Sequence, residues 1–154
     1  MIDIIVGNIG TGKSTYAKNN LKDKCLVWNA DEIRKMFHPG VYIFDVEENL
    51  VIQSMKIAFI EEGLRLGFDL CFDDTNINRE IRSELISIIR EASEDVEIRC
   101  IDFGKGNDET LERRRKESRG VNPDLWNEVH KKFFDEYQEP QLDEGFKEIK
   151  TINI

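Results

Sequence analysis

Residues 7–14 read Gly7-Asn8-Ile9-Gly10-Thr11-Gly12-Lys13-Ser14 and match the pattern Gly-x-x-x-x-Gly-Lys-Ser in full. The run at residues 3–7 is β-rich and stops at a glycine, and residues 13–21 favour a helix. Glycines allow the backbone between such a strand and helix to turn with its N–H groups pointing inward, which makes a concave anion site. The amino terminus of the helix adds a partial positive charge. The stretch therefore predicts a phosphate-binding loop.

The last two residues of the motif have predicted roles of their own. We expect the Lys13 ammonium to reach the β- and γ-phosphates of ATP, and the Ser14 hydroxyl to ligate Mg²⁺. The motif predicts ATP binding with Mg²⁺ but leaves the reaction open. The residues expected to contact ATP here are Gly7, Asn8, Ile9, Gly10, Thr11, Gly12, Lys13, Ser14 and Thr15.

Length and composition indicate one globular domain spanning residues 1–154. The chain is 40% apolar and 9% aromatic, which is ordinary for a folded domain. Its apolar runs fall short of the roughly 18 residues that a membrane span needs, and its start lacks the basic flank of a secretory signal. We expect a soluble, cytoplasmic protein without a membrane partner.

The charge and the metal-binding residue types exclude some functions. A net charge of −9 disfavours non-specific nucleic-acid binding, so any such role depends on a local basic patch, which residues 113–119 provide. His38 and His130 each stand alone, which gives no support for a histidine- or cysteine-bound metal. The widely spaced cysteines lie in or beside apolar runs, so we expect them in buried strands: Cys25, Cys71 and Cys100.

Strand-like and helix-like segments alternate along the chain. Strands are expected at residues 3–7, 25–28, 68–72, 96–103 and, as an edge strand, 146–154. Helices are expected at residues 13–21, from 31 onward, and at 46–66, 81–92, 109–118 and 123–134. This order predicts an α/β three-layer sandwich of the P-loop kinase type, with a mostly parallel five-stranded sheet and helices on both faces.

Other parts of the chain favour a kinase over other P-loop proteins. The third strand ends Phe72-Asp73-Asp74-Thr75 rather than in the Asp-Glu pair of many motor ATPases, and the Asn-Lys-x-Asp signature of GTPases is missing. Asp31 follows the second strand, where open α/β sheets place their ligands, and could serve as a general base or simply cap a helix. Arg34, three residues on, could pair with Asp31 or hold a substrate phosphate.

Four blocks between about residues 3 and 120 resemble the 5′-polynucleotide kinases of the phage and bacterial end-healing type. The first block is the phosphate loop, and the second is Trp28-Asn29-Ala30-Asp31-Glu32-Ile33-Arg34. The third is Asp74-Thr75-Asn76-Ile77-Asn78, and the fourth, Arg115-Lys116-Glu117-Ser118-Arg119-Gly120, is similar to that family's lid. The resemblance implies a lid at about residues 105–122.

The resemblance also implies roles for single residues. Asp31 would take the proton of a 5′-hydroxyl while Arg34, with Thr75, would hold the 3′-phosphate of the terminal nucleotide. Asp74 would either orient Arg34 or bind a water on Mg²⁺. The third block as a whole would contribute to the substrate site, through Asp74, Thr75 and Asn76.

In the lid, Arg119 and Arg115 would act on the β- and γ-phosphates like arginine fingers. A solvated, salt-bridged helix face is the alternative for Arg113 and Arg114. The implied reaction moves the γ-phosphate of ATP to the 5′-hydroxyl of DNA or RNA, and the acidic balance limits the expected contact to the last one or two nucleotides.

Two further hypotheses remain open. A kinase for another hydroxyl acceptor, such as a small metabolite, a sugar, a modified DNA base or aminoacyl-tRNA, would keep every motif above. A non-catalytic regulator that binds ATP would keep the loop and transfer no phosphate. The sequence alone does not separate these hypotheses, because the acceptor pocket is not readable from it.

Overall fold

The computed structural model describes residues 1–153 apart from 22, 40–42 and 118–119. The described residues form a five-stranded sheet in the order β2-β3-β1-β4-β5, and its four strand pairs are parallel. The strands are β1 (Ile2–Val6), β2 (Leu26–Trp28), β3 (Leu70–Phe72), β4 (Ile98–Asp102) and β5 (Glu148–Thr151). The predicted parallel α/β sheet is confirmed, with β5 at an edge as expected.

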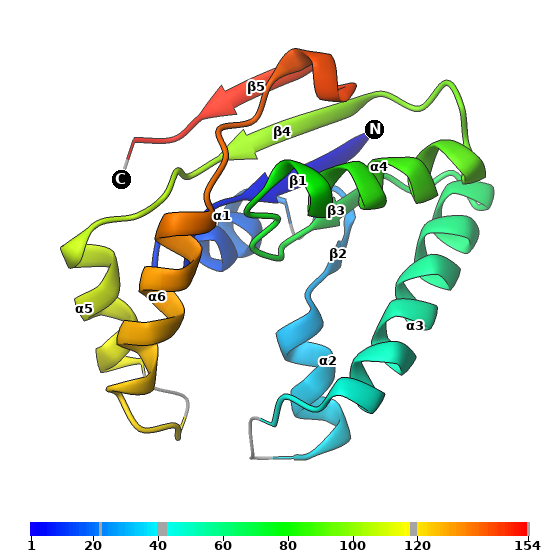
Figure 1. Ribbon diagram of the computed structural model, residues 1–154. Helices are drawn as coiled ribbons and strands as arrows, with labels where there is room; N and C mark the ends of the chain where they lie inside the picture. The colour runs from blue at the N-terminus through cyan, green and yellow to red at the C-terminus, as the bar shows by residue number, and fades with distance from the viewer. Residues whose placement is uncertain (22, 40–42, 118–119, 154) are drawn as a thin grey trace.

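Helices cover both faces of this sheet (Figure 1). Those of the described residues are α1 (Lys13–Asn20), α2 (Ala30–Phe37), α3 (Val46–Arg65), α4 (Arg79–Ala92), α5 (Asp108–Lys116) and α6 (Leu125–Glu136), with a 3₁₀ turn at Leu142–Glu144. The larger core cluster packs α3 and α4 on one face, with Ile60 and Ile89 fully buried against strand residues such as Ile4 and Phe72. The smaller cluster packs Ala17 of α1 on the other face.

This layering places the site at the carboxyl ends of the strands. The phosphate loop connects β1 to α1, α2 follows β2, and α5 follows β4. Helices α5 and α6 lie side by side at this end of the sheet, away from α3 and α4 (Figure 1). Because all the strands run parallel, the segments that follow them meet at one edge.

Three local expectations need correction. Helix α2 begins at Ala30 and its cap is Asn29, whose side chain accepts from the Glu32 N–H, so Asp31 is not the cap. Helix α6 begins at Leu125, which leaves Pro123 outside its first turn. In α3, the spacing of Val51, Met55, Ala58, Phe59 and Leu66 predicts one apolar stripe, but Val51 is exposed and its neighbour Ile52 lies in the core instead.

The expectation of buried strand cysteines is confirmed for Cys71 and Cys100 but not for Cys25, which precedes β2. Cys71 and Cys100 are buried as free thiols, and Cys25 is half-buried. Burial raises the pKa of Cys100 to about 12, so this thiol is unreactive at neutral pH. Within the described residues, the helices are all too short or too polar to cross a bilayer.

Candidate active site

The phosphate loop requires glycine where other parts of the chain approach it. Gly10 has φ 74°, and a Cβ built on it would lie 2.0 Å from the carbonyl oxygen of Thr110 in α5. Gly12 has φ 98° and immediately precedes α1. Only glycine adopts such conformations readily, and only glycine leaves room for the close approach of α5 at position 10.

Asn8 connects the loop to the other side of the site. It is fully buried, and its side-chain amide donates to the carbonyl oxygens of Lys105 at 2.8 Å and His130 at 3.0 Å. Its Oδ1 accepts from the Ile9 N–H at 2.7 Å. His130 in turn meets the Thr110 hydroxyl at 3.0 Å. The loop is therefore fastened to α5 and α6 as well as to its own strand.

Lys13 lies inside the loop, ready to meet phosphate oxygens. Its ammonium donates to the Asn8 carbonyl oxygen at 2.6 Å, and the residue is 8% exposed. Burial lowers the pKa of Lys13 to about 8; the carboxylates of Asp73, Asp31 and Asp74 oppose this shift and the Arg114 guanidinium adds to it. A bound anionic ligand would stabilise the charged ammonium and so raise the pKa of Lys13 again.

Asp73 is a site residue that the sequence analysis did not single out. It follows β3, is 5% exposed, and its Oδ2 accepts from the Asn29 amide at 2.9 Å. Burial raises the pKa of this carboxyl, while hydrogen bonding to Asn29 and the nearby Ser14 hydroxyl favours its charged form. The signal was present, since an apolar strand that ends in an aspartate is the usual source of the second magnesium-associated residue in P-loop proteins.

Asp73 and Ser14 suit a magnesium ion. Asp73 Oδ1 is buried and makes no hydrogen bond of normal geometry within the part of the chain that is described, although Ser14 lies close by. The described residues contain no cluster of three acidic, histidine or cysteine side chains that could enclose a metal. Mg²⁺ commonly binds to one or two protein oxygens and completes its shell with water and substrate phosphates. The pair therefore fits the ion that the loop predicts.

Asp31 and Arg34 form an ion pair within reach of the loop. Arg34 Nη1 donates to Asp31 Oδ1 at 2.9 Å, and Arg34 Nη2 donates to the Asn49 side chain in α3, also at 2.9 Å. Arg34 is 8% exposed, whereas the Asp31 side chain is 35% exposed. The negative charge of Asp31 also acts to raise the pKa of Lys13, so the two groups interact electrostatically.

Asp74 is hydrogen-bonded to the first residue of α2. Its Oδ1 accepts from the Ala30 N–H at the start of α2, at 3.0 Å. Burial raises the pKa of Asp74; the Ala30 hydrogen bond and the positive charges of Lys56 and Arg34 oppose the shift. Asp74 thus stabilises the start of the helix that carries Asp31 and Arg34. Its interaction with Arg34 is electrostatic.

Thr75 and Asn76, the other residues of the third block that were expected to contact substrate, make contacts within the protein. The Thr75 carbonyl accepts from the Gly7 N–H at 2.9 Å, which ties the turn after β3 to the loop. Asn76 is 4% exposed, has φ 44°, and donates its amide to the Ile5 carbonyl at 2.8 Å. The Asn76 side chain thus stabilises the turn, whose backbone conformation asparagine tolerates, and its expected substrate contact stays a prediction.

The basic residues of α5 divide into two groups. Arg113 Nη1 donates to the Gly10 carbonyl at 3.0 Å, and Arg114 is near enough to lower the pKa of Lys13. Arg115, the residue expected to act on ATP, lies 3.5 Å from Glu112 and 3.6 Å from Asp124 in ion pairs. Arg119 lies outside the described residues. Arg113 and Arg114 are therefore the arginines that lie at the loop, although a solvated helix face was the alternative expected for them from the sequence.

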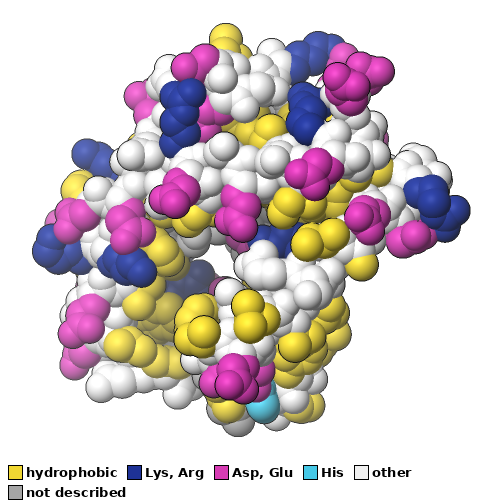
Figure 2. Space-filling model, turned by 45° about the vertical axis from the view of Figure 1, so that its right-hand side comes forward, with side chains coloured by type: hydrophobic (Ala, Val, Ile, Leu, Met, Phe, Trp, Pro, Cys, Tyr) yellow, Lys and Arg dark blue, Asp and Glu magenta, His cyan; other side chains and the backbone are white. Residues whose placement is uncertain are grey.

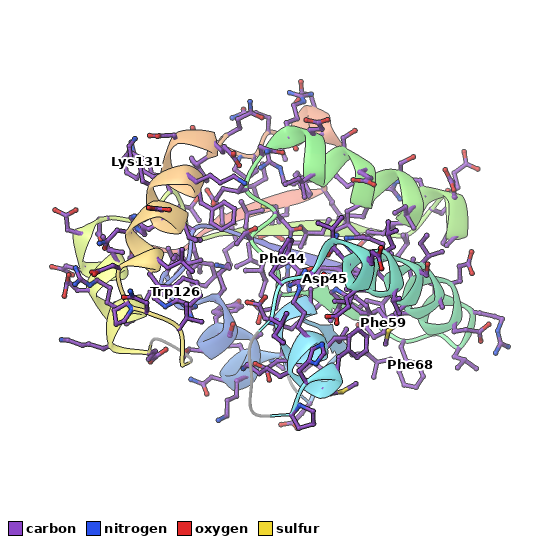
Figure 3. The ribbon with its side chains drawn as sticks, turned by 60° about the horizontal axis from the view of Figure 1, so that its bottom comes forward. Phe44, Asp45, Phe59, Phe68, Trp126 and Lys131 are labelled. Carbon is purple, nitrogen blue, oxygen red and sulfur yellow. The ribbon has the colours of Figure 1, made fainter. Side chains whose placement is uncertain are left out.

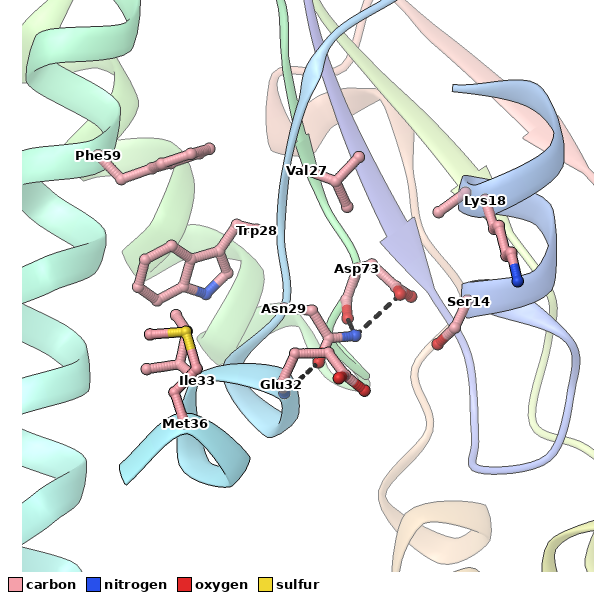
Figure 4. A pocket seen from close by; sticks show the side chains of 11 residues that line it. Ser14, Lys18, Val27, Trp28, Asn29, Glu32, Ile33, Met36, Phe59 and Asp73 are labelled. Atoms are coloured by element: carbon pink, nitrogen blue, oxygen red, sulfur yellow. Dashed lines mark hydrogen bonds between the residues drawn. The ribbon is translucent and has the colours of Figure 1, made fainter. Parts of the chain in front are cut away.

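A cavity of about 550 Å³ opens beside the proposed metal position (Figure 4). Ser14 and Asp73 line one end, and the apolar side chains of Trp28, Met36 and Phe59 line the other. Asp31 and Arg34 are not among its lining residues, so the cavity approaches the loop from the opposite side of α2.

The parallel sheet, the glycine-shaped loop and the buried lysine together define a nucleotide-binding protein with the P-loop kinase fold. A model of the family described as "AAA domain" matches residues 3–140, and the chain belongs to this family. The P-loop kinase part of the expectation is thereby confirmed, whereas the specific likeness to polynucleotide kinases stays a prediction.

Solved structures share this fold at low sequence identity. Kti12 from Chaetomium thermophilum, solved in complex with ADP-AlF3, is 15% identical with a TM-score of 0.60, covering 99% of this chain and 89% of that chain. A gluconokinase from Sinorhizobium meliloti 1021 is 15% identical with a TM-score of 0.53, covering 99% and 81%. A deoxyadenosine kinase from M. mycoides is 14% identical with a TM-score of 0.53, covering 100% and 90%. These likenesses establish a common fold.

Proposed function

We propose that this protein is an ATP-dependent phosphotransferase that moves the γ-phosphate of ATP to the 5′-hydroxyl end of DNA or RNA. The observation that carries the proposal is the position of the Asp31–Arg34 ion pair. The charge of its carboxylate acts on Lys13 in the phosphate loop, and its buried guanidinium is hydrogen-bonded to Asn49 in α3. A base beside the phosphate loop and a cation that can hold an acceptor are the parts that transfer to a hydroxyl needs.

The residues divide the reaction between them. Lys13 and the loop N–H groups hold the phosphates, with Arg113 and Arg114 adding positive charge from α5. The acceptor hydroxyl oxygen attacks the γ-phosphorus and gives its proton to Asp31, while the bond to the β-phosphate oxygen breaks and ADP leaves. Ser14 and Asp73 would hold Mg²⁺, which offsets charge on the phosphates when bound.

Arg34 supports a phosphate-bearing acceptor. A guanidinium has five N–H donors, and the hydrogen bonds to Asp31 and Asn49 use one donor on each of two nitrogens. Donors that remain could pair with a phosphate, as the resemblance to 5′-polynucleotide kinases implies. The acceptor would then be recognised by its 3′-phosphate rather than along a basic groove, which suits the net charge of −9.

The direct test is incubation with γ-labelled ATP and a panel of acceptors. The panel contains 5′-hydroxyl DNA and RNA ends, nucleoside 3′-phosphates, nucleosides, hydroxymethylated bases, aminoacyl-tRNA and sugars. We expect label on ends and on nucleoside 3′-phosphates, and little on nucleosides. Label on sugars or aminoacyl-tRNA alone would show that the acceptor is not a nucleic-acid end. ATP binding without any labelled acceptor would support the regulator hypothesis.

A further inference from the structure

An exposed aromatic ring lies against the buried guanidinium of Arg34. The Arg34 Cζ atom is 4.8 Å from the centroid of the Phe44 ring, which is within the range of a cation–π contact. Arg34 is 8% exposed, but Phe44 is 63% exposed. The ring therefore covers Arg34 and still presents much of its own surface to solvent.

Two further exposed apolar side chains follow Phe44 closely in the chain. Val46 and Leu50 lie one turn apart at the start of α3 and are 74% and 66% exposed. Asn49, beside Leu50, makes the hydrogen bond that fixes Arg34. We call Phe44, Val46 and Leu50 the apolar platform. Hydrophobic side chains gather in the lower half of the face that Figure 2 shows.

The platform lies next to the proposed acceptor site. Phe44 is on the side of α3 that faces α6 in Figure 3, and it contacts the arginine that is paired with Asp31. Large apolar side chains gain nothing from such exposure in the absence of a ligand, so an exposed cluster beside an active site indicates a binding surface.

Charge limits what can bind there. Asp45 and Glu47 flank the platform and are exposed, so a ligand with several phosphates would meet repulsion. Arg34 provides a cation for one anionic group, and Phe44 provides a flat face for a planar ring. A nucleotide carries both features, whereas a sugar or a sugar phosphate lacks the ring.

We propose that Phe44 determines the specificity of the acceptor site: a nucleobase of the acceptor stacks on Phe44 while the phosphate of the same nucleotide pairs with Arg34. This inference rests on the proposed phosphotransferase function and specifies its acceptor. Stacking on an aromatic ring tolerates every base, so the site selects for the presence of a base rather than for its identity.

The test compares two acceptors that differ only in the base. One is a 5′-hydroxyl deoxynucleoside 3′-phosphate, and the other is the abasic deoxyribose 3-phosphate. We expect the wild-type protein to prefer the first by about 5- to 100-fold in kcat/KM. The Phe44→Ala variant should lose most of this preference through KM, because the proposed contact of the ring is with the base of the acceptor and not with its reacting hydroxyl.

Two further variants sharpen the comparison. Phe44→Trp should keep the preference, because it retains an aromatic face. Phe68→Ala removes another exposed phenylalanine, beyond the carboxyl end of α3, and should behave like the wild type (Figure 3). The KM of the wild-type protein should also vary weakly with salt, with a logarithmic slope of about one phosphate contact.

The outcomes separate the inference from the function. Equal use of both acceptors by the wild type, or a base preference that survives in Phe44→Ala, would overturn the role of Phe44 and leave the kinase proposal intact. A complete lack of label on both acceptors, in protein that binds ATP, would overturn the acceptor class itself and the role of Phe44 with it.

Discussion

The side-chain amide of Asn8 donates to the backbone carbonyl of His130 at 3.0 Å, although 122 positions separate the two residues in the sequence. The same amide reaches the Lys105 carbonyl, and Asn8 is fully buried. These bonds join the phosphate loop to α6 and to the segment before α5. The loop therefore cannot shift independently of α6 or of the segment that leads into α5, the helix that carries the arginines.

Replacing Asn8 with alanine should lower both stability and nucleotide affinity. The buried His130 carbonyl and the part-buried Lys105 carbonyl would lose their donor, and an unsatisfied buried group costs about 1–3 kcal/mol. We expect the free energy of unfolding in urea to fall by about 2–4 kcal/mol. The control is Asn20→Ala, where an exposed amide donates to the Tyr16 carbonyl and the expected change is within about 0.5 kcal/mol. Equal losses in both variants would contradict a special role for Asn8.

The Asp31→Asn variant tests the general base. It should keep ATP binding and lose transfer by roughly 10²- to 10⁴-fold, because asparagine cannot accept the hydroxyl proton. Glu32→Gln is the matched control, since this adjacent carboxylate pairs with Lys35 at 2.5 Å and lines the cavity on the other side of α2. Single-turnover rates with labelled ATP measure both. If transfer survives in Asp31→Asn, a group other than Asp31 accepts the proton of the acceptor hydroxyl.

Lys13 should make ATP binding depend on pH. Burial lowers the pKa of the unliganded lysine to about 8, and bound phosphates should raise it. Above pH 8 the unliganded ammonium loses its proton, so binding must restore that proton and affinity should fall as pH rises. Below about pH 7 both states are protonated and the dependence should vanish. Calorimetry at pH 8.5 in buffers of different ionisation enthalpy should detect proton uptake, and Lys13→Met should not show it.

The same shift affects the stability of the unliganded protein. The pKa of Lys13 in the folded protein lies below the ordinary lysine value of 10.5, so the charged form is disfavoured on folding. This destabilising contribution is complete below pH 8 and is relieved as pH rises from about 8 toward 10.5. Lys13→Met should therefore raise the melting temperature at pH 7 while it abolishes nucleotide binding, which is a common trade-off at functional sites.

Asp73 should control the response to magnesium. Asp73→Asn should retain the increase in melting temperature that ATP causes in the presence of EDTA, because Lys13 and the loop remain. The further increase on adding Mg²⁺ should largely disappear, because the Asp73 carboxylate is buried close to the Ser14 hydroxyl and its Oδ1 has no hydrogen-bond partner among the described residues. Asp69→Asn provides the control, since this exposed aspartate pairs with the amino terminus. An undiminished Mg²⁺ effect in Asp73→Asn would rule out Asp73 as the magnesium-associated residue.

The arginines of α5 should differ in their effects. Arg114→Ala and Arg113→Ala should lower kcat/KM for ATP, by roughly 10²-fold if either residue meets the transferred phosphoryl group. Arg115→Ala should change it by no more than about 3-fold, because the exposed ion pairs of Arg115 contribute little. Steady-state kinetics with saturating acceptor provide the comparison. A larger loss in Arg115→Ala than in the other two would restore the assignment made from the sequence.

Much of the fold could be predicted because its determinants are local. The glycines at positions 10 and 12 adopt positive φ, and the strand before and helix after them follow from residue periodicity. Strands that alternate with helices leave few connections other than a parallel sheet. The positions of Asp31 and Arg34 on one helix face follow from their spacing, and the structure pairs them.

Other features depend on how the elements pack. Asp73 and Asp74 are adjacent, yet one meets Ser14 and the other meets the first turn of α2, because successive residues leave a strand in different directions. Along α5, each step turns the side chain by about 100°, so the helix phase against the loop decides that Arg113 reaches Gly10 while Arg115 faces Glu112.

By itself, then, the sequence determined the phosphate loop, the order of the elements and the ion pair, since each depends on residues close together in the chain. The tertiary structure alone decided that Asp73 accompanies Ser14, that Arg113 and Arg114 approach the loop, and that Phe44 covers Arg34. Contacts of this kind join separate elements, and their geometry is set by sheet order, helix phase and core packing rather than by local sequence.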